Sequence, residues 1–108
     1  MVNNVVGIGR DMTLSDQNLK ENITIIPNAL DKVKLLTGNT FTWKTGHPEG
    51  ALVTGNDDVG VIAQEVEALG LSGITSTRGG YKFVSYKRLI PVMLEAIKEL
   101  SAKVDALS

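Results

Sequence analysis

Hydrophobic residues recur at alternating steps of three and four along the last part of the chain, and this is the clearest pattern in the sequence. Such spacing is that of a heptad repeat, in which apolar side chains form one stripe along a helix. The pattern predicts a long C-terminal helix that associates with copies of itself. The stripe consists of Ile90, Met93, Ile97, Leu100, Val104 and Leu107.

Additional apolar residues widen the face of this helix. Leu89, Val92, Leu94 and Ala96 stand outside the stripe, so the helix has room to contact its own domain and other chains at once. A helix packed only on its own domain is the simpler alternative. Pro91 suits a first helical turn, so we expect the helix to begin or to bend there.

Two shorter helices are predicted upstream of this one. Asn28 is a suitable N-cap residue for a helix over residues 29 to about 36. A second helix, over about residues 62–69, has its apolar side chains on one face and ends at Gly70. Both are short, so each depends on packing against other elements for its stability.

Alternation of polar and apolar residues predicts strands between and after these helices. One strand covers residues 41–44, and two more, residues 74–77 and 81–84, flank Arg78-Gly79-Gly80, which suits a hairpin turn. Residues 45–58 are rich in Gly, Asn, Asp and Pro and form a long loop of the kind that is often functional. Together the elements predict an α+β fold of short helices and β-hairpins with a long C-terminal helix.

Composition narrows the class of protein. The 108 residues make one domain, and a net charge of −1 provides no basic surface for nucleic acid. With no cysteine and one histidine, neither a disulfide scaffold nor a thiolate metal site is expected, and we expect no metal or cofactor. No apolar run reaches membrane length. Only 5% of the residues are aromatic, so we expect a thin core and an oligomer that contributes stability.

A serine and a lysine near the N-terminus are the minimum parts of a nucleophile with an amine base. In a straight strand Ser15 and Lys20 would lie ~16 Å apart, so the chain has to turn between them, and Asp16-Gln17-Asn18 suits a turn. A lysine base must also lose its proton, which requires a pKa of about 10.4 to fall by roughly three units, about 4 kcal/mol. Burial or a neighbouring cation produces such a fall.

The same residues also fit an ordinary helix cap. Ser15 or Asp16 can cap a short helical turn, with Lys20 in solvent. A serine and a lysine at this spacing are common by chance. On this alternative, no chemistry takes place at Ser15.

Three segments together resemble one protein family. They are residues 15–20 (SDQNLK), 60–67 (GVIAQEVE) and 86–92 (YKRLIPV). In this order and at these separations they resemble the C-terminal intramolecular chaperone domain of phage tail spikes and tail fibres, also called the endosialidase chaperone or self-cleaving peptidase domain. The resemblance extends over residues 14–107, nearly the whole chain.

The resemblance implies a mechanism for the serine and the lysine. Members of the family cut the peptide bond immediately before the serine, with the lysine as base. Carried onto this sequence, the scissile bond is Leu14–Ser15, with Ser15 as the nucleophile and Lys20 as the general base. The enzyme is then a single-turnover serine peptidase that acts on its own chain.

The resemblance also divides the chain and indicates supporting residues. Residues 1–14 are expected to be the end of an upstream fibre or spike, and residues 15–108 the chaperone domain. Asp16, Gln64 and Glu65 are expected to support the site or an interface.

The partners follow from the resemblance as well. The expected assembly is a homotrimer, formed through a trimeric coiled-coil-like bundle of the C-terminal helices, whose client is the upstream fibre or spike of the same chain. It would act in the host cytoplasm during phage assembly and leave the mature virion fibre after cleavage. The stripe residues by themselves favour two strands, because Ile and Val alternate with Met and Leu. The trimer therefore rests on the resemblance.

Two other functions stay open at this point. The domain could be a permanent trimerisation cap that is never cleaved, with Ser15 as a helix cap. Alternatively, the loop of residues 45–58 could bind a receptor, which would make the domain the tip of an adhesin. Cleavage of the parent protein separates the first alternative, and receptor binding by the isolated domain would support the second.

Overall fold

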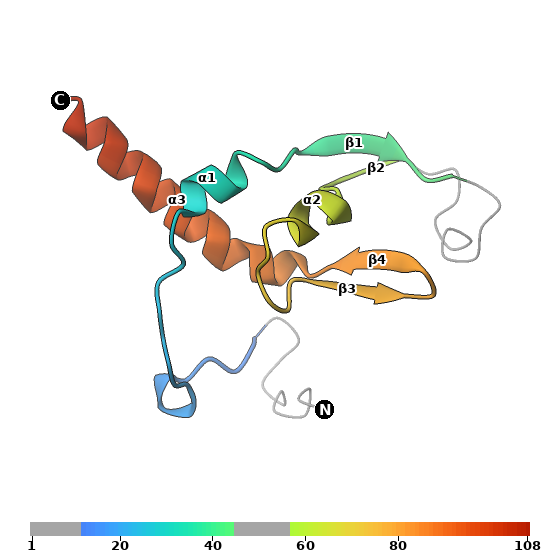
Figure 1. Cartoon of the computed structure of the whole chain (residues 1–108), viewed down its shortest axis with the longest axis horizontal. Helices are drawn as coiled ribbons and strands as arrows, with labels where there is room; N and C mark the ends of the chain where they lie inside the picture. Colours follow the sequence, from blue (N-terminus) through green and yellow to red (C-terminus); the bar gives the residue numbers. More distant parts are fainter. Residues whose placement is uncertain (1–11, 45–56) are drawn as a thin grey trace.

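The computed structural model describes residues 12–44 and 57–108. Residues 1–11 of the expected fibre remnant and residues 45–56 of the predicted loop lie outside this described part. The α+β composition is confirmed, with short elements followed by one long helix (Figure 1). In chain order the elements are the 3₁₀ helix η2 (Gln17–Leu19), α1 (Ala29–Val33), β1 (Asn39–Thr42), β2 (Asp57–Gly60), α2 (Ala63–Glu67), β3 (Thr75–Arg78), β4 (Tyr81–Val84) and α3 (Tyr86–Ala106).

The described strands form two separate antiparallel hairpins. β1 pairs with β2 and β3 pairs with β4. Gly79 and Gly80 join the second pair with φ of +60° and +83°, the left-handed values that a two-residue hairpin turn needs and that glycine adopts without strain. The predicted hairpin is confirmed, but β3 (Thr75–Arg78) lies one residue later than predicted, because Arg78 pairs with Tyr81 and does not belong to the turn. β1 begins at Asn39, two residues before the predicted strand, and ends at Thr42.

Helix α1 begins where predicted, but Asn28 does not cap it. Asn28 has a φ of 53°, in the left-handed region, and its side chain makes no capping bond. The carboxylate of Glu99, in α3, takes this place: Oε2 accepts a hydrogen bond from the N–H of Ala29 and Oε1 from that of Leu30, each at 2.9 Å. The predicted local cap is wrong because a side chain 70 residues away satisfies the donors. α1 also ends at Val33, earlier than predicted.

Helix α3 begins at Tyr86, before Pro91, so of the two alternatives for the proline, a helix start or a bend, the first is wrong. The backbone N–H of Arg88 donates a hydrogen bond to Ser85 Oγ at 3.4 Å, which places Ser85 as the N-cap residue. The helix runs through Pro91, which has no N–H to offer the carbonyl of Lys87.

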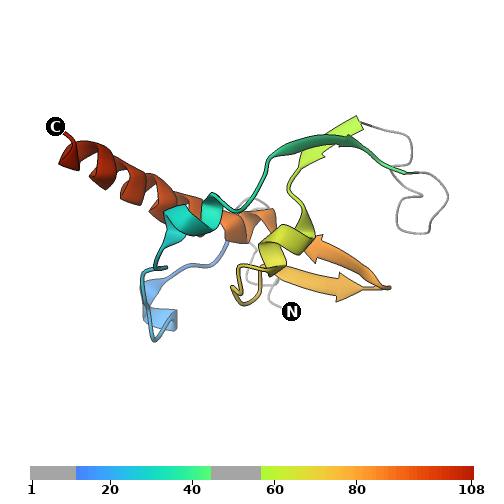
Figure 2. The same cartoon turned by 45° about the horizontal axis from the view of Figure 1, so that its top comes forward.

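The core forms where α3 crosses the shorter elements. Its inner face buries Leu89, Val92 and Ala96, and each of the other buried apolar residues comes from a different part of the chain. Figure 2 shows α1 against the middle of α3 and α2 beside the hairpin of β3 and β4. The core residues of the described chain are Ala29, Val66, Ile74, Leu89, Val92 and Ala96.

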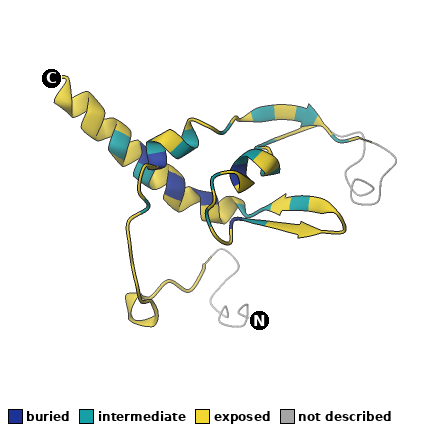
Figure 3. Cartoon of the chain, in the orientation of Figure 1, coloured by how far each residue is buried: buried dark blue, intermediate teal, exposed yellow. Residues whose placement is uncertain are grey.

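The heptad stripe lies on a different face of α3 and stays exposed in the single chain. Its side chains are between 50% and 87% exposed, and Figure 3 shows the C-terminal half of α3 almost wholly exposed. The prediction that α3 packs on its own domain is confirmed for Leu89, Val92 and Ala96, whereas Leu94 is exposed. Self-association through the stripe stays a prediction. The exposed residues of the stripe are Ile90, Met93, Ile97, Leu100, Val104 and Leu107.

The contact between Glu99 and α1 makes the fold sensitive to acid. The N–H groups of Leu30 and Ala29 bond to the charged carboxylate and hold the pKa of Glu99 below its usual value of 4.5. A carboxyl whose pKa is lower in the folded chain stabilises the fold fully above its unfolded value, and the contribution is lost as pH falls through the folded value. We expect Glu99→Gln to be less stable than wild type at neutral pH and to lose less stability between about pH 5 and 3, measured by thermal unfolding.

Glu95→Gln is the matched control on the same helix. The carboxylate of Glu95 pairs with Lys98 at 3.3 Å, and a single surface pair contributes little. An acid dependence that Glu95→Gln reduces as much as Glu99→Gln does would contradict the role given to Glu99.

Candidate functional site

Ser15 and Lys20 are brought together by the short helix η2. The backbone turns between them as expected, and the N–H of Leu19 bonds to the carbonyl of Asp16 at 3.1 Å. As a result Lys20 Nζ donates a hydrogen bond to Ser15 Oγ at 2.7 Å. This is the distance at which a serine and a lysine can exchange a proton.

Asp16, and not Ser15, is the N-cap residue of η2. Its Oδ1 accepts a hydrogen bond from the N–H of Asn18 at 2.8 Å, and its backbone is extended, as an N-cap residue requires. The Ser15 hydroxyl is therefore free for Lys20. Asp16 supports the pair indirectly, because it fixes the turn that returns Lys20 to Ser15.

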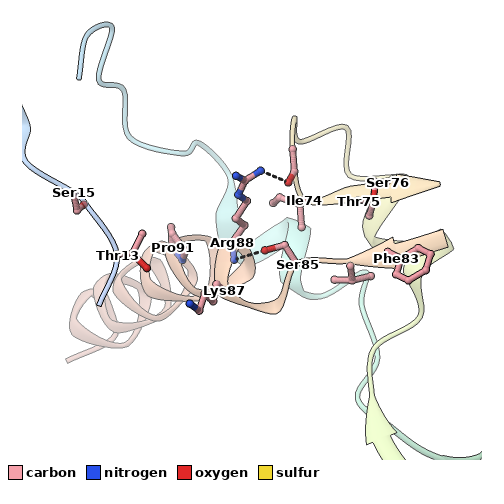
Figure 4. A pocket seen from close by; sticks show the side chains of 12 residues that line it. Thr13, Ser15, Ile74, Thr75, Ser76, Phe83, Ser85, Lys87, Arg88 and Pro91 are labelled. Atoms are coloured by element: carbon pink, nitrogen blue, oxygen red, sulfur yellow. Dashed lines mark hydrogen bonds between the residues drawn. The ribbon is translucent and has the colours of Figure 1, made fainter. Parts of the chain in front are cut away.

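Thr13 and Ser15 line an open pocket of about 880 Å³ against the rest of their own chain (Figure 4). The opposite wall comes from the ends of β3 and β4 and the first turns of α3. Lys87 and Arg88 are its charged residues, and Arg88 Nη1 donates to the carbonyl of Gly73 at 2.7 Å. The residues on either side of Leu14 thus face the same pocket.

Gln64 and Glu65 have different surroundings. Glu65 Oε1 accepts hydrogen bonds from the backbone N–H and the hydroxyl of Thr37, at 3.0 and 2.9 Å. These bonds fix the chain where it enters β1. Gln64 is exposed and its side chain makes no hydrogen bond within the described residues. In the described chain neither residue has a hydrogen bond to Ser15 or Lys20.

The motif at residues 60–67 is locked to the start of α3 by Tyr86. Its hydroxyl oxygen accepts a hydrogen bond from the N–H of Val61 at 3.1 Å. A side chain at Gly60 would collide with this hydroxyl, so the close approach requires glycine there. Sequence reasoning missed the contacts of Tyr86 and Glu99, because each joins segments that lie far apart in the chain.

The surroundings of the pair are open. Both Ser15 and Lys20 are exposed in the single chain. The described residues contain no group of His, Cys, Asp and Glu that could hold a metal ion. None of the helices in residues 12–44 and 57–108 has the length and apolarity that a membrane crossing requires.

Comparison with known families adds one finding. A family model described as the chaperone of endosialidase, and named as a peptidase, matches residues 15–73, more than half of the chain. The chain belongs to the endosialidase chaperone family. The resemblance to this family is thereby confirmed. The match includes the motifs at residues 15–20 and 60–67, and the motif at residues 86–92 lies beyond it. No curated protein matches the chain.

The matched region of this endosialidase chaperone domain includes the Ser15–Lys20 pair and excludes most of the C-terminal part. It begins at Ser15, whose hydroxyl accepts a hydrogen bond from Lys20, and includes the Asp16 side chain that caps η2. It also covers α1, the first hairpin and α2, and it stops before β3. The heptad stripe of α3 lies outside it.

Proposed function

We propose that this chain is an intramolecular chaperone that trimerises, aligns a phage tail fibre or spike for folding, and then releases itself by cutting the Leu14–Ser15 bond. The observation that carries the proposal is the 2.7 Å hydrogen bond between Lys20 Nζ and Ser15 Oγ. The position of Ser15 also supports the proposal, because Ser15 is the first residue of the family match.

The proposed chemistry needs only the groups of this pair and water. The neutral amine of Lys20 accepts the proton of Ser15 Oγ as this oxygen attacks the carbonyl carbon of Leu14. The C–N bond of Leu14–Ser15 breaks, and the nitrogen takes the proton from Lys20 and becomes the free α-amine of Ser15. An ester then links Leu14 to the oxygen of the same serine. Water then hydrolyses the ester, which leaves a carboxylate on Leu14 and restores the hydroxyl.

A lysine in water keeps its proton, so the base needs surroundings that a single chain does not provide. Lys20 is exposed here, and removal from water is what disfavours a charged ammonium. Neighbouring chains in a trimer would supply this. On this proposal, assembly precedes cleavage.

The exposed stripe of α3 supports the assembly step. Fibre chains that interweave must find a common register before their non-local β-structure can form, which is slow. A C-terminal trimer raises the local concentration of the three client strands and aligns them. Removal of the folding aid then leaves the fibre protected by a high unfolding barrier. These steps belong in the host cytoplasm, with the domain absent from the mature fibre.

A permanent trimerisation cap that never cleaves is the second candidate. The exposure of Lys20 and the capping bond of Asp16 favour it, because both fit a purely structural turn. A denaturing gel of the full-length parent distinguishes the two functions, since cleavage gives two bands and a permanent cap gives one.

We expect Ser15→Ala to leave the parent protein uncleaved but folded and trimeric. Asp16 supplies the cap of η2, and even the loss of a cap would cost only about 1 kcal/mol. A denaturing gel and sedimentation of the same sample measure the two properties. Processing at the wild-type rate would show that Ser15 is not the nucleophile.

Lys20→Arg should also block cleavage without loss of the trimer. Arginine keeps the charge and can still donate a hydrogen bond to Ser15 Oγ, but it does not give up its proton at any workable pH. The rate of appearance of the two fragments is the measurement. If the arginine variant cleaves efficiently, Lys20 has only an electrostatic role.

Placing Asp at both Ile97 and Leu100 should abolish the trimer and cleavage together. Two carboxylates in the centre of the stripe would be buried in the assembly at a cost of several kcal/mol per chain, unless the helices separate. Sedimentation should then give a monomer, and the parent should stay intact on a gel. Ala102→Asp, at an exposed position outside the stripe, is the control. A monomer that still cuts itself would show that assembly does not control the chemistry.

A further inference from the structure

The pocket beside the proposed scissile bond is lined by two positively charged side chains and, within the described chain, by no acidic one. The charged residues are Lys87 and Arg88, from the first turns of α3. A pocket with cationic and hydroxyl groups on its walls is suited to a negatively charged group. The hydroxyls come from Thr13, Ser15, Thr75, Ser76 and Ser85.

The intact Leu14–Ser15 bond carries no charge, but the proposed cut leaves a carboxylate on Leu14. Thr13 and Ser15 line the pocket, whereas Leu14 does not. The pocket therefore does not hold the bond itself. After the cut, the carboxylate belongs to a free chain end, attached one residue, or about 3.8 Å of chain, from Thr13. The charge of the pocket thus matches the product of the cut and not the intact chain.

Among the cations around the cut, Lys87 is the one with a side chain still available. Arg88 Nη1 is bonded to the carbonyl of Gly73 at 2.7 Å, and Lys20 Nζ is bonded to Ser15 Oγ at 2.7 Å. The side chain of Lys87 makes no hydrogen bond or ion pair with any described residue. Figure 4 shows Arg88 and Lys87 leaving α3 in different directions.

We propose that the ammonium of Lys87 binds the carboxylate that cleavage leaves on Leu14, so that the cut end of the fibre stays on the chaperone domain after the reaction. Release of the domain is then a separate step from cleavage. This inference rests on the proposed cut at Leu14–Ser15. It assigns a role to Lys87 that the chemistry of Ser15 and Lys20 does not require.

The contact is weak in one chain and becomes effective in an assembly. A single exposed ion pair changes an equilibrium by no more than about 5-fold. In the proposed trimer, three cut ends stay on three domains, and all three contacts have to break before the domain leaves, so their effects multiply. Exposed ion pairs are screened by salt, so the retention is expected to be salt-dependent.

Release of the domain from the cleaved parent protein tests this inference. The parent is kept until a denaturing gel shows that cleavage is complete, and gel filtration at intervals then gives the fraction of domain that still elutes with the fibre. Lys87→Gln removes the charge and should release the domain at least ~10-fold faster than wild type at low salt. Lys87→Arg keeps the charge and pairs well with a carboxylate, so it should release the domain no faster than wild type.

Lys34→Gln is the matched control, because it removes the same charge at an exposed position that does not line the pocket. It should release the domain at the wild-type rate. A Lys87→Gln domain that also leaves at the wild-type rate would overturn the inference. A Lys87→Gln parent that stays uncut would overturn it too, since Lys87 would then belong to the cleavage step.

Salt provides a second measurement on the wild-type protein. An increase from about 50 mM to about 500 mM NaCl should speed release of the wild-type domain at least ~10-fold and that of Lys87→Gln much less. Release that is indifferent to salt contradicts the ion pair.

The two proposals fail in different ways. A wild-type parent that gives one band on the denaturing gel contradicts the proposed cleavage itself. Two bands with immediate release of the domain contradict only the binding of the cut end by Lys87.

Discussion

The fold depends on a single helix that has to present two apolar faces at once. The inner face of α3 holds Leu89, Val92 and Ala96 in the core, while the stripe that includes Ile97 and Leu100 remains in water. A helix can carry two such faces because residues three or four apart share a side and intermediate residues do not. Since the inner face and the stripe belong to the same helix, any change in how the domain packs on α3 also changes the position of the stripe relative to the domain.

The core is too small to place the other elements by burial alone, and hydrogen bonds between distant segments complete the arrangement. Glu99 holds the start of α1, Glu65 holds the entry to β1, and Tyr86 holds the start of the family motif at Val61. In each case a side chain accepts a bond from a backbone N–H that has no partner in its own element. Such bonds are directional, so they fix orientation where nonspecific apolar contact would allow several.

The predictable parts of the structure were those decided by local sequence. Gly79 and Gly80 favour a hairpin turn because strand-like segments flank them, and the spacing of the stripe residues directly indicates one face of a helix. The turn between Ser15 and Lys20 was expected from Asp16-Gln17-Asn18, but only the resemblance indicated that these two side chains are a pair. The cap of α1 was mispredicted because the bond comes from Glu99, and nothing near Asn28 in the sequence could reveal it. The hydrogen bonds of Glu65 were not predicted either, because their partner, Thr37, is distant in the sequence.

Ser15 and Lys20 lie apart from the stripe of α3, and this has a consequence for the order of events in the proposed mechanism. Ser15 and Lys20 already lie at bonding distance in the single chain, so assembly does not need to bring them together. What the single chain lacks is an environment that takes Lys20 out of water. A peptidase that acts once on its own chain gains from this arrangement, because a cut made before the client strands are aligned cannot be repeated. On this mechanism, the turn at η2 sets the distance between Ser15 and Lys20 within one chain, and the partner chains remove Lys20 from water.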